Sequence, residues 1–177
     1  VREMPSVVEH VCVPVIREET FVQGVVENGG PFPVLPGMSS IVLDGGYLGQ
    51  MPTQTIAPGQ RIELALGIDR GVKVEREQQQ LSERGGIFGN QKRRTYKISI
   101  EIRNYRDDTV TLRLLDRIPY TYDENIRVEA EERTHEPSED HGNGMLEWTL
   151  ELAPGAEETL EFVYTLKHNK NYRVWHP

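Results

Sequence analysis

The clearest hydrophobic pattern in the chain has a period of two and covers residues 94–119. Apolar and polar residues alternate there, a polar stretch at residues 104–108 interrupts them, and the alternation resumes until Pro119. Successive side chains of a β-strand point to opposite faces, so this period is typical of a strand with one buried side. The pattern predicts a long β-hairpin that needs a second layer over its apolar face. The apolar positions are Tyr96, Ile98, Ile100, Ile102, Val110, Leu112 and Leu114.

Alternation of the same kind predicts strands beside two Ala-Pro-Gly segments. Residues 146–152 and 160–166 alternate on either side of Ala153-Pro154-Gly155, and residues 62–68 follow Ala57-Pro58-Gly59. Proline and glycine favour turns because proline presets one backbone angle and glycine tolerates positive φ. The two segments therefore predict two turns and suggest a weak internal repeat.

The remaining first half predicts further strands separated by turns. Residues 7–16 are rich in valine, and Pro14 places this strand at a sheet edge or bulge because proline cannot donate to a ladder. Residues 28–37 hold three prolines and three glycines and predict a loop. Asp44-Gly45 supplies the tight turn of a short hairpin over residues 41–48. The valines expected to share one face of the first strand are Val7, Val11, Val13 and Val15.

These elements predict a single β-sandwich domain over residues 1–177. Short strands with turns about every eight to twelve residues are typical of antiparallel all-β sandwiches, and the immunoglobulin-like or Greek-key type is expected. No amphipathic helix of useful length is predicted. Val72 begins a separate strand, and residues 77–94 are expected to form strand extensions that lead into a mobile exposed loop. The acidic residues 129–144 are expected to form a second mobile loop.

Composition narrows the classes of function. The chain is 37% hydrophobic and 27% charged with a net charge of −8, which argues against a nucleic-acid partner. No apolar run approaches the roughly 20 residues that a membrane-spanning helix needs, so no membrane insertion is expected. The single cysteine, Cys12, excludes an internal disulfide and a cysteine-based zinc site. The compartment stays open, and because the chain starts at Val1 without a signal peptide, we expect it to be part of a longer protein.

Several segments, taken in order and spacing, resemble one known family. In the first half they are residues 28–37, 44–49, 57–59, 66–69 and 72–76, and in the second half they are residues 104, 116–119, 126–128, 144–148 and 152–155. Together they are similar to the uncharacterised C-terminal domain of the mucoidy-inhibitor-like proteins, over nearly the whole chain. The resemblance implies a parent protein with an N-terminal β domain and a coiled coil ahead of this domain. It implies no catalytic residues, and the family name points to exopolysaccharide production.

One segment combines residue types that bind metals. Two imidazoles and three carboxylates fall within seven residues, and these groups suit zinc or another divalent cation. Metal ligands usually lie on rigid elements with organised neighbours, whereas this set lies in an acidic loop, so a solvated loop is the competing interpretation. The candidate ligands are His135, Glu136, Glu139, Asp140 and His141.

A second segment is a candidate interaction surface. Residues 85–89 are rich in glycine and precede three basic residues, but a phosphate-binding loop is not expected because no helix follows. A basic loop with an apolar tip that contacts a partner fits better, although Phe88 is also able to fold back onto the sandwich. The candidate residues are Ile87, Phe88, Lys92, Arg93 and Arg94.

Carboxylate and guanidinium neighbours at predicted strand ends are expected to orient loops rather than to catalyse a reaction. Asp116-Arg117 and Asp69-Arg70 are the two examples, and neither has a nucleophile or base nearby in the sequence. Trp148 is expected in the core, while Trp175 and Tyr172 are expected to pack at the terminus or to join an aromatic binding patch.

The sequence therefore favours a non-catalytic β-sandwich without a cofactor, which binds another protein or the other domains of its parent chain. Two alternatives stay open. A carbohydrate-binding module would show a row of exposed aromatic residues on one sheet face, and a metal-dependent hydrolase would show convergent polar groups in a pocket.

Overall fold

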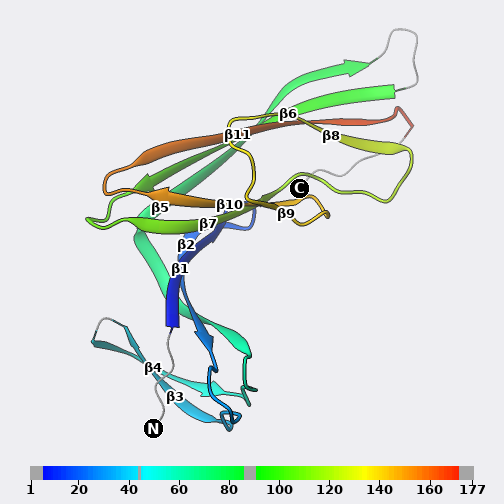
Figure 1. Ribbon diagram of the computed structural model, residues 1–177. Helices are drawn as coiled ribbons and strands as arrows, with labels where there is room; N and C mark the ends of the chain where they lie inside the picture. Colours follow the sequence, from blue (N-terminus) through cyan, green and yellow to red (C-terminus); the bar gives the residue numbers. More distant parts are fainter. Residues whose placement is uncertain (1–5, 44, 86–90, 172–177) are drawn as a thin grey trace. The chain divides into compact units, whose positions relative to one another are not determined.

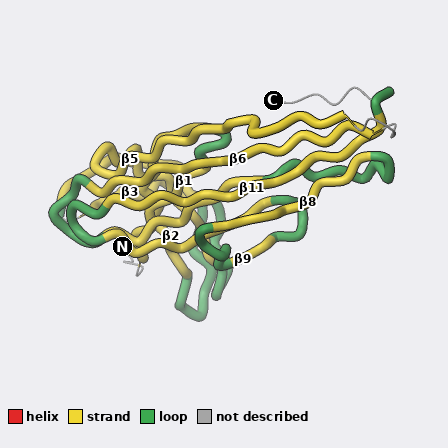
Figure 2. Tube along the Cα trace, turned by 90° about the horizontal axis from the view of Figure 1, so that it is seen from above, coloured by secondary structure: helices red, strands yellow, loops and turns green. Residues whose placement is uncertain are grey.

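The computed structural model describes residues 6–43, 45–85 and 91–171, and those residues form strands and connecting loops without a helix (Figures 1 and 2). The predicted all-β class is thereby confirmed. The strands are β1 (Ser6–Val13), β2 (Arg17–Glu27), β3 (Gly37–Leu43), β4 (Gly46–Thr53), β5 (Arg61–Gly85), β6 (Gln91–Asn104), β7 (Val110–Arg117), β8 (Ile126–Arg133), β9 (Glu139–Asp140), β10 (Met145–Leu152) and β11 (Glu157–Asn169).

The chain divides into two compact units. The first unit combines Val1–His10 with Phe21–Asp69, and the second combines Val11–Thr20 with Arg70–Pro177. Strands β3 and β4 lie in the first unit as a separate two-stranded sheet. Strands β6 to β11 lie in the second unit, while β1, β2 and β5 contribute residues to both.

The second unit is a two-layered β structure with one apolar core. The larger sheet has the order β8-β11-β6-β5-β2-β1-β7-β10-β9. Although β10 and β11 are far apart in that order, Trp148 of β10 stacks on Phe162 of β11 with ring centroids 5.8 Å apart. The sheet therefore turns back on itself, and β6 and β11 face β7 and β10 across the core (Figure 1). The core contains Cys12, Val72, Val74, Tyr96, Ile98, Ile100, Ile102, Val110, Leu112, Leu114, Leu146, Trp148, Leu152, Leu160, Phe162, Tyr164 and Leu166.

The predicted hairpin of residues 94–119 is wrong, although both of its strands are present. β6 pairs with β5 and β11, whereas β7 pairs with β1 and β10, so the two strands belong to opposite layers. Residues 105–109 carry the chain from one layer to the other. An alternating pattern only shows that each strand has one buried face, and two strands that face each other across a core satisfy it as well as two neighbours in one sheet.

Two segments predicted to contain mobile loops are partly strand. Residues 77–85 continue β5, and residues 91–94 begin β6, because the two backbones pair without a break in the ladder from Val72↔Asn104 to Gly85↔Lys92, apart from one irregularity. A ladder needs backbone partners rather than apolar side chains, so a polar sequence did not prevent it. Residues 129–133 likewise belong to β8, which pairs with β11. Residues 86–90 lie outside the described residues.

The valines predicted to share one face of the first strand are not its most buried residues. Cys12 is fully buried, whereas Val7 is 63% exposed and Val11 and Val13 are only partly buried. β1 ends at Val13 and lies between β2 and β7 in the sheet order, so Pro14 follows the ladder and does not mark a sheet edge. The strand does not alternate regularly between a buried and an exposed face, since Val8, four positions before the buried Cys12, is 40% exposed.

A buried asparagine connects the two layers of the second unit. Asn104, 1% exposed, ends β6, and its side-chain amide donates to the carbonyl oxygens of Asp108 at 3.0 Å and Leu152 at 2.9 Å. Its Oδ1 accepts a hydrogen bond from the backbone N–H of Arg106 at 3.0 Å. Its own carbonyl accepts from the N–H of Gly155 at 3.0 Å, at a turn where Gly155 has a φ of 71° that favours glycine.

The same arrangement recurs in the first unit around Asn28, which is fully buried. Its amide donates to the carbonyls of Phe32 at 3.0 Å and Ile56 at 2.9 Å, and its carbonyl accepts from the N–H of Gly59 at 2.8 Å. Each asparagine thus binds the carbonyl four residues later and the residue that precedes an Ala-Pro-Gly turn. The weak repeat in the sequence corresponds to a repeated three-dimensional motif, which we call the asparagine clasp.

We expect the hydrogen bonds of the asparagine clasp to contribute to the free energy of unfolding. Asn104→Ala should lower the free energy of unfolding by about 2–3 kcal/mol, because it leaves the buried carbonyl of Leu152 without a donor. Chemical denaturation followed by tryptophan fluorescence measures this change. Asn125 is exposed, so Asn125→Ala should cost no more than about 0.5 kcal/mol. Equal losses in the two variants would contradict the role of the clasp.

Candidate functional site

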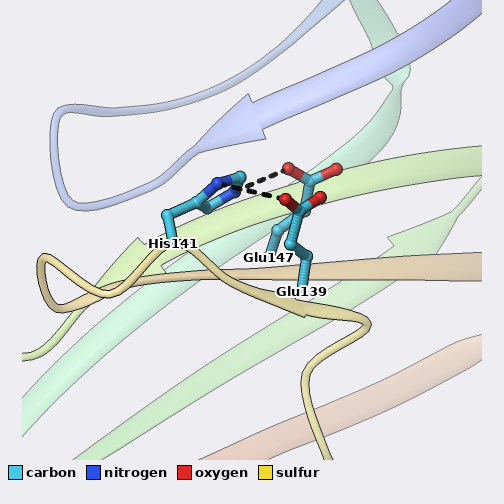
Figure 3. Close-up of side chains that lie close together, drawn as sticks. All are labelled: Glu139, His141 and Glu147. Atoms are coloured by element: carbon cyan, nitrogen blue, oxygen red, sulfur yellow. Dashed lines mark hydrogen bonds and ion pairs between the residues drawn. The ribbon is translucent and has the colours of Figure 1, made fainter.

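The structure gathers three metal-ligating side chains at the edge of the second unit (Figure 3). β9 pairs with β10 and places Glu139 directly opposite Glu147. His141 follows β9, and its Nε2 lies 3.1 Å from Glu147 Oε2 while its Nδ1 lies 3.5 Å from Glu139 Oε1. One ligand atom from each residue lies within 4.8 Å of the others. The three residues form what we call the β9–β10 cluster.

The guanidinium group of Arg113 is already hydrogen-bonded to the buried carboxylate of this cluster, that of Glu147. Arg113 of β7 donates from Nε to Glu147 Oε1 at 2.9 Å and from its terminal nitrogen to Oε2 at 3.5 Å. These bonds, more than the one from His141, hold the pKa of Glu147 below its usual range against the opposing effect of burial. The ionised form is therefore favoured on folding, so this contribution to stability is present above the carboxyl's unfolded pKa and is lost as the pH falls through its folded pKa.

The arrangement fits an ion-pair network better than a metal centre. A divalent cation bound by Glu147 would have to share the carboxylate with a guanidinium of like charge, which raises the cost of binding. The network instead connects three neighbouring segments of the sheet. Arg113 lies on β7, Glu147 lies on β10, and His141 directly follows β9. Its clear chemical role is to fasten the short β9 segment to the sheet.

The structure brings together two of the five predicted metal ligands, Glu139 and His141. His135 contributes its carbonyl oxygen to the indole N–H of Trp148 at 3.1 Å, Glu136 pairs with Arg133 at 3.5 Å, and Asp140 accepts a hydrogen bond from the N–H of Gly142 at 2.9 Å. Sequence reasoning missed Glu147 because it occupies a polar position of an alternating strand, where an exposed side chain is expected. The predicted burial of Trp148 is confirmed, since it is 1% exposed.

At each of the two predicted strand-end pairs, the carboxylate contacts a side chain from a distant strand. Asp116 is fully buried and accepts from Arg76 Nε at 2.6 Å, and it also accepts from the backbone N–H of Arg117 at 2.6 Å. Burial raises the pKa of Asp116, and the hydrogen bond from Arg76 opposes that shift. Asp69 lies 2.9 Å from Nε2 of His10. These contacts suit a structural role, because each carboxylate ties together two strands that are not adjacent in the sheet order, β5 with β7 through Asp116 and β5 with β1 through Asp69.

The buried thiol of Cys12 is unsuited to nucleophilic chemistry. Burial raises its pKa to about 12, so the reactive thiolate is not formed at ordinary pH. The side chain lies in the core of the second unit with no exposed surface.

The predicted basic surface is only partly described. Lys92, Arg93 and Arg94 are strand residues of β6, and Arg93 pairs with Glu131 of β8 at 2.9 Å. Ile87 and Phe88, the proposed tip, lie outside the described residues, as do Tyr172 and Trp175.

The first unit carries an exposed apolar surface that sequence reasoning missed. Of the chain's 20 basic and 28 acidic residues, only Asp44 falls within residues 28–60. Large apolar side chains in this segment are nevertheless exposed to solvent. The near absence of charged residues from residues 28–60 was the sequence signal that could have indicated this surface. We call the exposed set the uncharged surface; it comprises Phe32 (73% exposed), Leu35 (74%), Met38 (64%), Val42 (61%), Tyr47 (65%) and Leu48 (51%).

Comparison with known proteins identifies the family. Residues 3–170 match the family model described as "Domain of unknown function (DUF4139)". The chain belongs to this family. Protein F37C4.5 of Caenorhabditis elegans is 25% identical to this DUF4139 chain over 171 residues, which cover 90% of the chain and 31% of that relative. The chain thus spans about a third of the curated relative it matches, and no solved structure matches it.

A groove of about 390 Å³ lies in the first unit of the DUF4139 chain. Two of its charged side chains, Arg61 and Glu27, pair with each other at 2.9 Å. Ser6 also lines the groove, but no histidine does, so a nucleophile with an adjacent imidazole base is absent from its lining. Separately, none of the described residues builds a helix that is long and apolar enough to cross a membrane.

The ion-pair assignment of the β9–β10 cluster leads to a test with zinc. Excess Zn²⁺ should leave the melting temperature of the wild-type domain unchanged, because Arg113 occupies the Glu147 carboxylate. Arg113→Ala should cost about 1–2 kcal/mol of stability, since one charge-assisted hydrogen-bonded pair is lost from a largely buried carboxylate. A saturable rise of the wild-type melting temperature that His141→Ala abolishes would contradict this assignment and establish a metal site.

Proposed function

We propose that this DUF4139 domain is a non-catalytic interaction domain whose first unit binds another polypeptide through the uncharged surface. The observation that carries the proposal is the exposure of six large apolar side chains in a segment with a single charged residue. Large apolar side chains are costly to expose when they gather in one segment, and the centres of protein interfaces are depleted in charged residues. The surface has the composition of an interface rather than that of a solvated face.

The wider setting supports a partner within a larger protein. The chain spans 31% of the length of its relative from Caenorhabditis elegans. The resemblance to the mucoidy-inhibitor-like proteins, stated above from the sequence, suggests a parent with an N-terminal β domain and a coiled coil. We therefore propose other domains of the parent chain, or a separate protein, as partners in an envelope- or exopolysaccharide-related protein.

The two alternative functions find less support. A carbohydrate-binding module would present a row of exposed aromatic residues along a sheet face. Tyr120 and Tyr122 contact each other edge-to-face at 5.0 Å in the connection after β7. Of the other exposed aromatic residues, only Tyr47 lies on a described strand, while Phe32 and Tyr105 lie in connections. A metal-dependent hydrolase would use the β9–β10 cluster, where Arg113 competes with a cation for Glu147.

A photoreactive amino acid tests the proposal. Benzoylphenylalanine at position 42, within the uncharged surface of the full-length protein in its own cells, should give a covalent adduct with another polypeptide segment on irradiation. The matched control places the same residue at position 132, an exposed charged site on β8. The proposal fails if position 42 yields no more adduct than position 132.

A further inference from the structure

Free sheet edges differ in how well they are protected. In the part of the chain that the structure describes, β8 and β9 end the larger sheet, and β3 and β4 each have one outer edge. The outer edge of a strand presents unpaired N–H and C=O groups, which pair readily with another strand. Proteins usually block such edges with charge, proline, irregular backbone or short length.

Three of these four edges are blocked. Five of the eight residues of β8 are charged, and β9 has only two residues. β4 contains Pro52, which lacks an N–H, and Gly49, whose φ of 155° accompanies an irregularity in its pairing with β3. Each edge therefore carries at least one feature that disfavours the addition of a strand.

β3 has none of these protective features. Its seven residues, Gly-Met-Ser-Ser-Ile-Val-Leu, include no charge and no proline, and Ile41 and Val42 are β-branched residues that favour strands. Met38 is 64% exposed and Val42 is 61% exposed on the same face, with the exposed Ser40 between them. An unprotected edge beside an exposed apolar face is suited to strand addition.

We infer that β3 pairs in antiparallel fashion with β3 of a second copy of this chain, an inference that rests on the proposed interaction function. A pairing centred on Ser40 places Met38 of each copy opposite Val42 of the other, so apolar side chains meet on the exposed face. Such a symmetric contact is self-complementary, as a two-fold dimer interface must be.

Sheet size favours a second copy as the occupant, and the local lack of charge permits one. The chain carries a net charge of −8, so two copies repel each other over most of their surfaces, but β3 lies in the 28–60 segment whose only charged residue is Asp44. An isolated two-stranded hairpin is marginally stable in water, and the pairing converts the β3–β4 hairpin into a four-stranded sheet of the order β4-β3-β3-β4.

A charge-swap experiment tests the inference by sedimentation velocity over a dilution series. The wild-type domain should form a dimer. Ser40→Lys and Ser40→Glu should each weaken it several-fold, because like charges then lie directly opposite each other on the two-fold axis. An equimolar mixture of the two variants should restore a dimer that contains one copy of each.

Gln50 provides the matched control, since it lies opposite Ser40 on β4 and is also exposed. Gln50→Lys and Gln50→Glu should leave the dimer unchanged. A monomeric wild type at every concentration, a mixture that fails to restore association, or equal weakening by the Gln50 variants would overturn the β3 pairing. If the wild type is monomeric while position 42 still forms adducts with a different polypeptide, the inference fails and the proposed function stands; without any such adduct, both fail.

Discussion

The asparagine clasp is the interaction on which the rest of the structure depends. Each buried asparagine satisfies carbonyl groups at the point where a strand ends and the chain must turn, and its own backbone receives the glycine N–H of an Ala-Pro-Gly turn. Buried carbonyls without a partner are costly, so a crossing between layers needs such a donor. In the second unit, the clasp of Asn104 joins the ends of β6 and β10, strands of opposite layers, and so closes one end of the core.

The two units use the same clasp but present different surfaces. The second unit encloses the Trp148–Phe162 core and surrounds it with ion pairs, such as Arg113–Glu147 and Arg93–Glu131. The first unit instead leaves apolar side chains in solvent over a segment with almost no charge. A well-packed core in one unit and an apolar face in the other suit a domain in which the second unit supplies stability and the first unit supplies binding.

The sequence predicted the strands and most core positions, because the period of two in residues such as Ile98, Ile100 and Ile102 depends on local geometry alone. It did not predict strand partners. The segments of β6 and β7 were interpreted as a hairpin, because an alternating pattern does not show which layer a strand joins. The polar half of β5 has no such pattern and needs none, because backbone pairing with β6 holds it in place. Asn104, Asp116 and Glu147 each have one partner far away in the sequence, at separations of 48, 40 and 34 residues, and these distant contacts left no local signal. The uncharged surface did leave a local signal, because residues 28–60 contain a single charged residue, but the prolines and glycines of this segment were interpreted only as turns.

Amide hydrogen exchange in the Asn104→Ala variant tests the central role of the clasp most directly. In the wild type, the amides of Asn104 and Gly155 should exchange slowly although Gly155 lies in a turn, because both donate within the clasp. In the variant, these two amides should lose protection while Asn28 and Gly59, which belong to the clasp of the first unit, keep theirs. Fast exchange of Gly155 in the wild type, or unchanged protection in the variant, would contradict the account.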